Sequence, residues 1–295
     1  MGSALTTMQA PVAPMPGRLD GCPAPAKLNL FLHVTGRRPD GYHLLQSAFR
    51  LLDWGDTLDF AIRGDGRIHR VNDLPGIPED ADLTVRAAQS LQRASGCTFG
   101  VDITVHKHLP VGGGLGGGSS DAATTLMALD RLWGLGLGHA RLREIGLALG
   151  ADLPFFIYGR DAFVEGIGET LQPLDLPPAW YVVVAPRASV PTARIFASPE
   201  LTRNTPPVRV HGLTLSRTRN DLQPVACARY PEVAEALSWL EQFAPARMTG
   251  SGACVFAAAD SAAHAEQIAG RCPARWRAWR AASLARHPMH GSGVM

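Results

Sequence analysis

Long apolar segments are missing from this 295-residue sequence. No run approaches the roughly 20 apolar residues that a membrane-spanning helix needs, and the first twenty residues lack an apolar core behind a basic start. We therefore expect these residues to form a disordered leader rather than a signal peptide. Metal and disulfide patterns are missing too, because the five cysteines are scattered and none forms a C-x-x-C pair. A cytoplasmic protein without a membrane partner is the simplest expectation.

Charge is also scarce. Charged residues make up 18% of the sequence, and the net charge of +2 is too small to predict a nucleic-acid partner. Hydrophobic residues, at 46%, are typical of a folded globular protein, and the length permits two domains of ordinary size. The arginine-rich stretch at 271–286 is expected to be a solvated face. A small-molecule substrate and a monomer or weak homodimer are expected.

Glycine, in contrast, is concentrated in one stretch. Six of the seven residues in 112–118 are glycine, and a helical pattern starts directly after them. Each glycine fixed in regular structure costs roughly 0.5–1 kcal/mol relative to alanine. Six of them cost on the order of 3–6 kcal/mol, a large part of a domain's roughly 5–15 kcal/mol of stability. This cost indicates that the backbone itself is a binding surface, and we interpret it as a phosphate cradle.

Three kinds of phosphate site compete for this stretch. Gly112, Gly114 and Gly117 satisfy G-x-G-x-x-G, but the acidic residue that a dinucleotide site has about twenty positions later is missing. A Walker loop fails because it needs Gly-Lys-Ser/Thr, whereas glycine stands directly before Ser119 here. A glycine loop, two serines and a helix N-terminus remain, where backbone N–H groups and the helix dipole favour an anion. The serines could instead only cap the helix, although capping needs one serine and no glycine loop.

The rest of the pattern predicts two domains. In the first, strands are expected at 26–34, 47–52, 57–62 and 101–106, and helices at 83–95, 119–133 and 139–149. In the second, strands are expected at 180–185, 246–249, 253–258 and 276–283, and helices at 232–243 and 262–268. The second set follows the split βαβ order. We expect a leader at 1–20, an N-terminal domain at 21–173, a C-terminal domain at 174–286 and a tail at 287–295.

A few polar residues stand out in this frame. Lys27 and Asn29 share the strand face opposite the alternating leucines, where they could serve one site. An ordinary solvent-facing edge also fits, and the pattern alone favours that edge. Asp152 precedes Leu153-Pro154 and is expected on a bent loop between a helix and a strand. Tyr42 and His43 follow a turn and could stack on, and hydrogen-bond to, a planar ligand.

Five segments together resemble the GHMP small-molecule kinases: Pro110–Ser120, Pro25–Leu30, Asp40–His43, Gly150–Pro154 and Thr249–Cys254. The resemblance implies an α+β two-domain GHMP kinase fold. Its N-terminal domain would be a ribosomal-S5-like α/β domain and its C-terminal domain a ferredoxin-like α/β sandwich, with the active site between them. The implied activity is phosphoryl transfer from ATP, with Mg²⁺, to a hydroxyl of a cytidyl diphosphate polyol. Another small alcohol, such as mevalonate or homoserine, is the alternative acceptor.

The resemblance also implies catalytic roles. Asp152 would be the catalytic base and Lys27 its partner, since a carboxylate can take the hydroxyl proton and an ammonium can offset charge on the transferred phosphoryl. The residues implied to bind the ATP phosphates are Pro110, Val111, Gly112, Gly113, Gly114, Leu115, Gly116, Gly117, Gly118, Ser119 and Ser120.

Substrate contacts are implied in the same way. Tyr42, His43 and Phe196 would surround the cytosine, and Asn29 and Thr192 would hold the polyol part. The loop Gly250–Gly252 would close the site from the second domain.

One position departs from the family pattern. Asp82 stands where the family often has asparagine, and an aspartate can accept from the adenine amino group but cannot donate to a ring nitrogen. No carboxylate is indicated as a magnesium ligand.

Two other functional classes fit part of the pattern: a nucleotide-binding module without catalysis and a dinucleotide oxidoreductase. The presence of both Lys27 and Asp152 argues against the first, and the missing acidic residue argues against the second.

Overall fold

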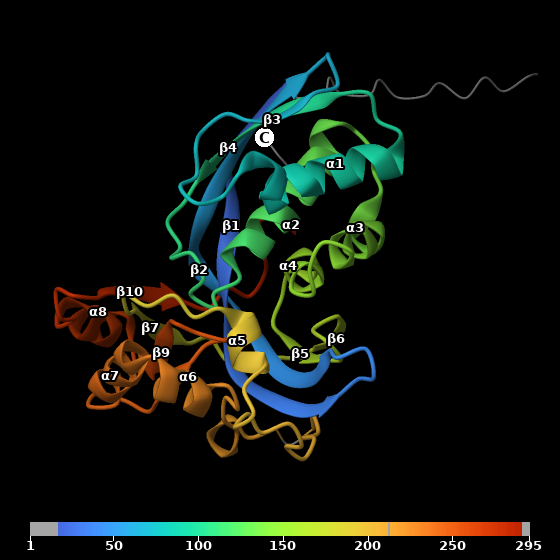
Figure 1. Cartoon of the computed structure of the whole chain (residues 1–295). Coiled ribbons are helices and arrows are strands. Elements are labelled where there is room, and N and C mark those ends of the chain that lie inside the picture. Colours follow the sequence, from blue (N-terminus) through green and yellow to red (C-terminus); the bar gives the residue numbers. More distant parts are fainter. Residues whose placement is uncertain (1–16, 212, 291–295) are drawn as a thin grey trace, which may run out of the picture.

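A computed structural model of the chain describes residues 17–211 and 213–290, which form two sheets with helices packed on them (Figure 1). The larger sheet has the order β3-β4-β2-β5-β6, with β1 paired to β2. Its strands are β1 (Arg18–Arg37), β2 (His43–Arg63), β3 (Ile68–Arg70), β4 (Gly100–His106), β5 (Ala162–Glu165) and β6 (Thr170–Pro173). The helices packed with it are α1 (Leu83–Ser95), α2 (Gly117–Leu132), α3 (Gly138–Leu147) and α4 (Leu153–Tyr158), and a short 3-10 turn, η1 (Glu79–Ala81), precedes α1.

The smaller sheet is antiparallel and has the order β10-β7-β9-β8. Its strands are β7 (Trp180–Ala185), β8 (Ala246–Met248), β9 (Val255–Ala259) and β10 (Arg277–Ala282). The accompanying elements are α5 (Thr192–Phe196), η2 (Leu215–Arg217), α6 (Gln223–Arg229), α7 (Pro231–Leu240) and α8 (Ala262–Gly270). A last 3-10 turn, η3 (Pro288–His290), lies against α2 and β1 instead. The first and third strands lie at the centre of the smaller sheet, which is the split βαβ arrangement predicted for this part of the chain.

The first strand is buried on both faces, so the expectation of a solvent-facing edge was wrong. Leu28 and Leu30 pack with Tyr181 and Val183 of the smaller sheet in one apolar cluster. On the other face, Lys27 is 4% exposed and Asn29 is 2% exposed. The alternation of apolar and polar residues along β1 therefore corresponds to two buried faces, one apolar and one polar. A polar face of this kind requires partners for every buried group.

The second strand corrects another expectation. The pattern predicted two short strands, at 47–52 and 57–62, with a break between them, whereas β2 runs without interruption from His43 to Arg63. Gly55 lies against β1, where an added Cβ would stand 2.2 Å from the carbonyl oxygen of Ala24. Asp56 accepts backbone hydrogen bonds from His108 and Leu109 instead of closing a turn. The turn-forming residues of this segment therefore serve tertiary contacts.

Two helix boundaries illustrate where local signals succeed and fail. Helix α1 spans the predicted residues, with Asp82 capping it through the Thr84 amide and Gly96 ending it in a left-handed conformation. The expected loop after Asp152 is wrong, because Leu153–Tyr158 is helix α4. Its proline lies in the first turn, where the missing N–H has no intrahelical partner to lose. Asp152 is the N-cap residue, but its side chain caps nothing.

Most of the expected leader lies outside the described residues, and Arg18–Asp20 at its end already belong to β1. None of the helices among residues 17–211 and 213–290 is long and apolar enough to cross a membrane.

The last described residues return from the smaller sheet to the larger one. The backbone of Leu284 bonds to Leu51, and that of His287 bonds to Gly159. The His290 ring stacks on His139 with centroids 4.1 Å apart, while His287 is fully buried. Burial, with the neighbouring His290 and His139, lowers the pKa of His287 to about 3. The expected tail therefore begins with an anchored segment.

Acid should weaken this anchor. The pKa of His287 is lower in the folded state than its ordinary value of 6.5, so below pH 6.5 the unfolded chain binds more protons. The free energy of unfolding should thus fall by about 1.4 kcal/mol per pH unit as the pH drops from 6.5 toward 4. Urea denaturation between pH 7 and pH 4.5 measures this slope. The variant His287→Asn should reduce it, whereas His211→Asn, at an exposed position, should not.

Candidate active site

Three cavities lie in a row along the junction of the two sheets. The central cavity, of about 380 Å³, is lined by Lys27, Asp152 and the loop Gly250–Gly252. A second cavity of about 380 Å³ shares Gly112, Gly114, Gly116 and Ser119 with it and continues over Pro110–Gly118; we call it the glycine-loop cavity. A third, of about 450 Å³, shares Leu45, Ile167 and Phe196 with the central cavity; we call it the aromatic slot, and its other lining residues are Asp40, Gly41, Tyr42 and His43. The arrangement suits an elongated ligand set.

The glycine loop leads directly into helix α2. Gly112, Gly114 and Gly116 adopt left-handed backbone angles, with φ of 71°, 77° and 74°. Gly116 is the N-cap of α2, and no side chain caps this helix. The alternative that the serines serve as caps is therefore not seen. The uncapped N–H groups of the first turn line the cavity and favour an anion there.

The same glycines also permit close packing between the two halves of the chain. A Cβ on Gly114 would stand 2.3 Å from the carbonyl oxygen of Thr249. The amide of Cys254 donates to the carbonyl of Gly113 at 3.1 Å. The cost of the glycines therefore reflects contact with the smaller sheet as well as a binding surface. The sequence pattern indicated only the second reason.

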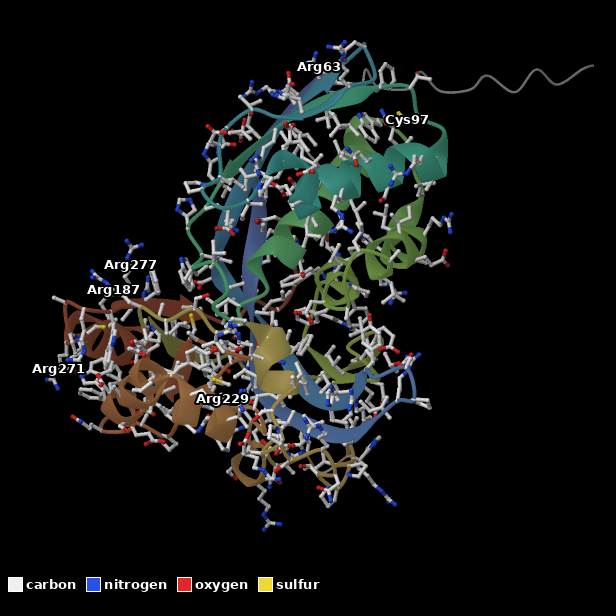
Figure 2. The ribbon with its side chains drawn as sticks, viewed as in Figure 1. Arg63, Cys97, Arg187, Arg229, Arg271 and Arg277 are labelled. Carbon is white, nitrogen blue, oxygen red and sulfur yellow. The ribbon has the colours of Figure 1, made fainter. Side chains whose placement is uncertain are left out.

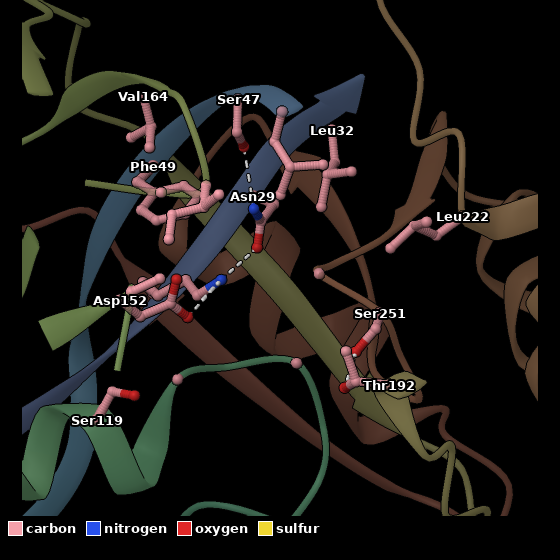
Figure 3. A pocket seen from close by; sticks show the side chains of 18 of the residues that line it. Asn29, Leu32, Ser47, Phe49, Ser119, Asp152, Val164, Thr192, Leu222 and Ser251 are labelled. Carbon is pink, nitrogen blue, oxygen red and sulfur yellow. Dashed lines mark hydrogen bonds and ion pairs between the residues drawn. The ribbon is translucent and has the colours of Figure 1, made fainter. Parts of the chain in front are cut away.

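Lys27 and Asp152 come together in the central cavity. The Lys27 Nζ atom lies 3.5 Å from a carboxylate oxygen of Asp152, with the lysine side chain 5% exposed and the aspartate side chain 33% exposed. Lys27 also donates to Asn29, which in turn donates to the Ser47 hydroxyl at 2.9 Å. Figure 3 shows Asp152 at one end of this line of polar groups, which continues through Asn29 to Ser47. The lysine is thus fixed, while the carboxylate has room for a ligand.

Phe49 contributes to the position of the lysine, and the sequence did not indicate it. The Lys27 Nζ atom lies 4.4 Å above the centre of the Phe49 ring, at a distance where a cation is attracted to an aromatic face. The carbonyl of Leu115 accepts from the Lys27 amide at 2.9 Å, which ties β1 to the glycine loop.

The implied nucleobase residues meet in the aromatic slot. His43 and Phe196 are tilted against each other with ring centroids 5.0 Å apart. Tyr42 is 60% exposed at the rim. Arg203, which the sequence did not indicate, donates to the His43 ring at 3.1 Å. The pKa of His43 is lowered by burial and by the charges of Arg203 and Arg37.

The other predicted residues differ in their access to the cavities. Thr192 and Ser251 share a hydrogen bond of 2.7 Å at the wall of the central cavity. Ser119 lines both neighbouring cavities, but the hydroxyl of Ser120 is buried and donates to the carbonyl of Pro25. The expected hydroxyl contact of Ser120 with phosphate is therefore wrong, because the side chain closes the contact with β1. Val111 is 71% exposed.

A charged cluster under the glycine loop was missed by sequence reasoning. Lys107 Nζ lies 2.7 Å from Asp121 and 2.5 Å from Asp56. Burial, and the charge of Asp56, raise the pKa of Asp121 to about 8 against the effect of Lys107. The sequence did hold one signal for this cluster, because it contains only two lysines. Lys27 lines the central cavity and Lys107 lines the glycine-loop cavity.

Asp82 also lines the glycine-loop cavity. Its carboxylate accepts hydrogen bonds from Arg70 and Thr84.

Comparison with known proteins identifies relatives of this chain. The family model "GHMP kinases N terminal domain" matches residues 82–160, and "GHMP kinases C terminal" matches residues 211–278. The 4-diphosphocytidyl-2-C-methyl-D-erythritol kinase of Azoarcus sp. (strain BH72) is 66% identical over 93% of this chain and 98% of its own. A crystal structure of 4-(cytidine 5'-diphospho)-2C-methyl-D-erythritol kinase is 35% identical, with a TM-score of 0.76 over 88% of this chain and 98% of that one. A mevalonate kinase structure, at 12% identity and a TM-score of 0.65 over 91% of this chain and 99% of that one, shares the fold alone.

Proposed function

Because this chain belongs to the GHMP kinase family, we propose that its three cavities hold ATP and an alcohol on either side of the glycine loop. The acceptor is the 2-hydroxyl of 4-diphosphocytidyl-2-C-methyl-D-erythritol, and the products are the 2-phosphate and ADP. This reaction belongs to non-mevalonate isoprenoid precursor synthesis. The observation that carries the assignment of sites is that the glycine-loop and central cavities share one wall, at Gly112, Gly114, Gly116 and Ser119.

The order of the cavities supports the placement of each substrate. The ATP phosphates would lie on the uncapped N-terminus of α2, and the polyol would lie between Asp152 and Thr192. The cytosine would enter the aromatic slot between Tyr42 and Phe196. An acceptor without a flat ring would leave that slot empty, which is why mevalonate or homoserine fits less well.

We infer the following roles for the polar residues of the central cavity. As the acceptor oxygen bonds to the γ-phosphorus, the bond from that phosphorus to the β,γ-bridging oxygen breaks, and its electron pair leaves with ADP. The hydroxyl proton passes to the carboxylate of Asp152. Lys27 lies 3.5 Å from that carboxylate and would offset charge on the transferred phosphoryl group. Asn29 and Phe49 hold the ammonium in place.

The proposed reaction also uses Mg²⁺. No group of three or more His, Cys, Asp or Glu side chains among residues 17–211 and 213–290 is arranged to hold a metal ion. This composition fits Mg²⁺ bound mainly through substrate phosphates, with the Ser119 hydroxyl at the shared wall as a neutral protein oxygen. The ion would neutralise charge on the phosphates.

A substrate panel tests the proposed function. Release of ADP from ATP should depend on 4-diphosphocytidyl-2-C-methyl-D-erythritol and on Mg²⁺, and a coupled assay should detect little turnover with mevalonate, homoserine or no acceptor. Equal turnover with mevalonate would contradict the assignment of the acceptor. Calorimetry that detects tight NAD binding without ATP binding would contradict the assignment of the glycine-loop cavity.

A further inference from the structure

Arg203 connects the two walls of the aromatic slot. On one wall, at the start of β2, Nε2 of His43 accepts a hydrogen bond from the Nε atom of Arg203 at 3.1 Å. One of its terminal nitrogens donates to the carbonyl of Phe196, the last residue of α5, at 3.0 Å and to that of Ser198, two residues later, at 2.6 Å. The other donates to the carbonyl of Leu201 at 3.1 Å. A single side chain thus fixes both His43 and the backbone that carries Phe196.

The hydrogen bond to His43 decides which ring nitrogen carries the proton. A guanidinium stays protonated in proteins, and its Nε atom can only donate. Nε2 of His43 must therefore be the acceptor, so it carries no hydrogen. A neutral imidazole has one N–H group, which leaves the proton on Nδ1. The tautomer follows from the hydrogen-bond partner, as it does wherever hydrogens are not observed.

The surroundings of His43 keep this ring neutral and leave its proton available. The pKa of His43 is lowered first by burial and then by the charges of Arg203 and Arg37. Its Nδ1 atom has no hydrogen-bond partner among the described residues, and the ring lines the slot. The N–H group at Nδ1 is consequently a preset donor for whatever occupies the slot.

We propose that Arg203 is a positioning residue that holds His43 as the Nδ1–H tautomer and thereby makes the aromatic slot prefer cytosine over uracil. This inference rests on the proposed function, because it takes a cytidyl group as the occupant. The N3 atom of cytosine is a bare acceptor, whereas N3 of uracil carries a hydrogen. A fixed donor facing this edge is satisfied by cytosine and is opposed by uracil. Sites built on such a hydrogen bond reject the mismatched analogue because a polar group is left unpaired.

The first experiment compares the cytidyl substrate with its uridyl analogue in four proteins: the wild type, Arg203→Met, His43→Asn and the double variant. Arg203→Met should lower the cytidyl-to-uridyl ratio of kcat/KM about tenfold, through a higher KM for the cytidyl substrate, with kcat within about threefold. An asparagine at 43 donates from an amide nitrogen whatever residue stands at 203. In that background, Arg203→Met should change the ratio less than about twofold, because the two residues act through one bond.

A matched control separates this effect from general loosening of the loop. Arg229 bonds to Ser198 and Glu200 of the same segment but does not bond to His43, and it lies at the end of α6 (Figure 2). Arg229→Met should keep the wild-type ratio. Equal losses in Arg229→Met and Arg203→Met, or additive losses in the double variant, would contradict the proposal.

NMR of the protein labelled with ¹⁵N-histidine reads the tautomer directly. The His43 signals are those absent from His43→Asn, and in the wild type they should show the proton on Nδ1. Arg203→Met should shift the ring toward the Nε2–H form. A wild-type ring with its proton on Nε2 would overturn the inference, even if Arg203→Met failed to fold. If the wild type did not turn over the cytidyl substrate, the proposed function would fail while this spectrum still tested the bond.

Discussion

Asp152→Asn should lower kcat by about 10²- to 10⁴-fold, the usual contribution of a positioned general base. The amide keeps the size of the side chain but cannot accept the proton of the acceptor hydroxyl. ATP binding should persist, because the glycine-loop cavity lies on the other side of the shared wall. Single-turnover kinetics and ATP titration measure the two quantities separately.

The substitution should leave the fold intact. Asp152 is one third exposed and its side chain caps no helix, and the asparagine amide oxygen can still accept a hydrogen bond from the buried Lys27 ammonium, so the fold should persist. The matched control is Asp260→Asn, at a carboxylate whose side chain is 96% exposed, and it should retain wild-type kcat. A kcat for Asp152→Asn close to that of Asp260→Asn would remove the base role from the mechanism.

Gly114→Ala should lower the stability of the protein strongly, because the added methyl group would meet backbone atoms, which cannot move aside as a side chain can. A Cβ at this position would stand 2.3 Å from the carbonyl oxygen of Thr249, and the residue has φ of 77°. Gly112 has a similar φ of 71°, but no atom lies within 4 Å of its Cβ position. Each alanine carries about 1–2 kcal/mol of left-handed strain, and only Gly114→Ala adds overpacking of about 1–3 kcal/mol.

The pair of variants therefore separates backbone strain from close packing. Urea denaturation should show a larger loss of unfolding free energy for Gly114→Ala than for Gly112→Ala. Displacing Thr249 also shifts the loop Gly250–Gly252 against the shared wall, so kcat/KM of Gly114→Ala should fall about 100-fold. Equal stabilities for the two variants would show that contact with the smaller sheet does not restrain the loop.

Particular residues show how far the sequence could go. The helix at Leu83–Ser95 was predicted to its ends, because Asp82 and Gly96 are local signals that do not depend on tertiary contacts. The split βαβ order of the smaller sheet was predicted for the same reason, since period and turn residues mark its strands. The break expected in β2 was wrong because Gly55 and Asp56 make contacts with distant segments.

The candidate site divides in the same way. The glycine stretch, Lys27 and Asp152 were indicated by residue type, spacing and family resemblance. Phe49, Arg203 and the Lys107 cluster were missed, since each acts on a residue far away in the sequence. The buried hydroxyl of Ser120 could not be distinguished from the accessible Ser119, because adjacent helix positions differ only in what packs against them.

The order of strands and helices and the glycine loop before α2 followed from local residue patterns, and the class of chemistry followed from the family resemblance. The first two depend on backbone preferences and on residue types that act locally. Three features came from the packing of distant segments: the contact of the glycines with the smaller sheet, the burial of both faces of β1, and the sharing of walls among the three cavities. The physical reason is that burial and hydrogen-bond partners are set by whichever segment packs against a residue, and that segment is usually distant in the chain.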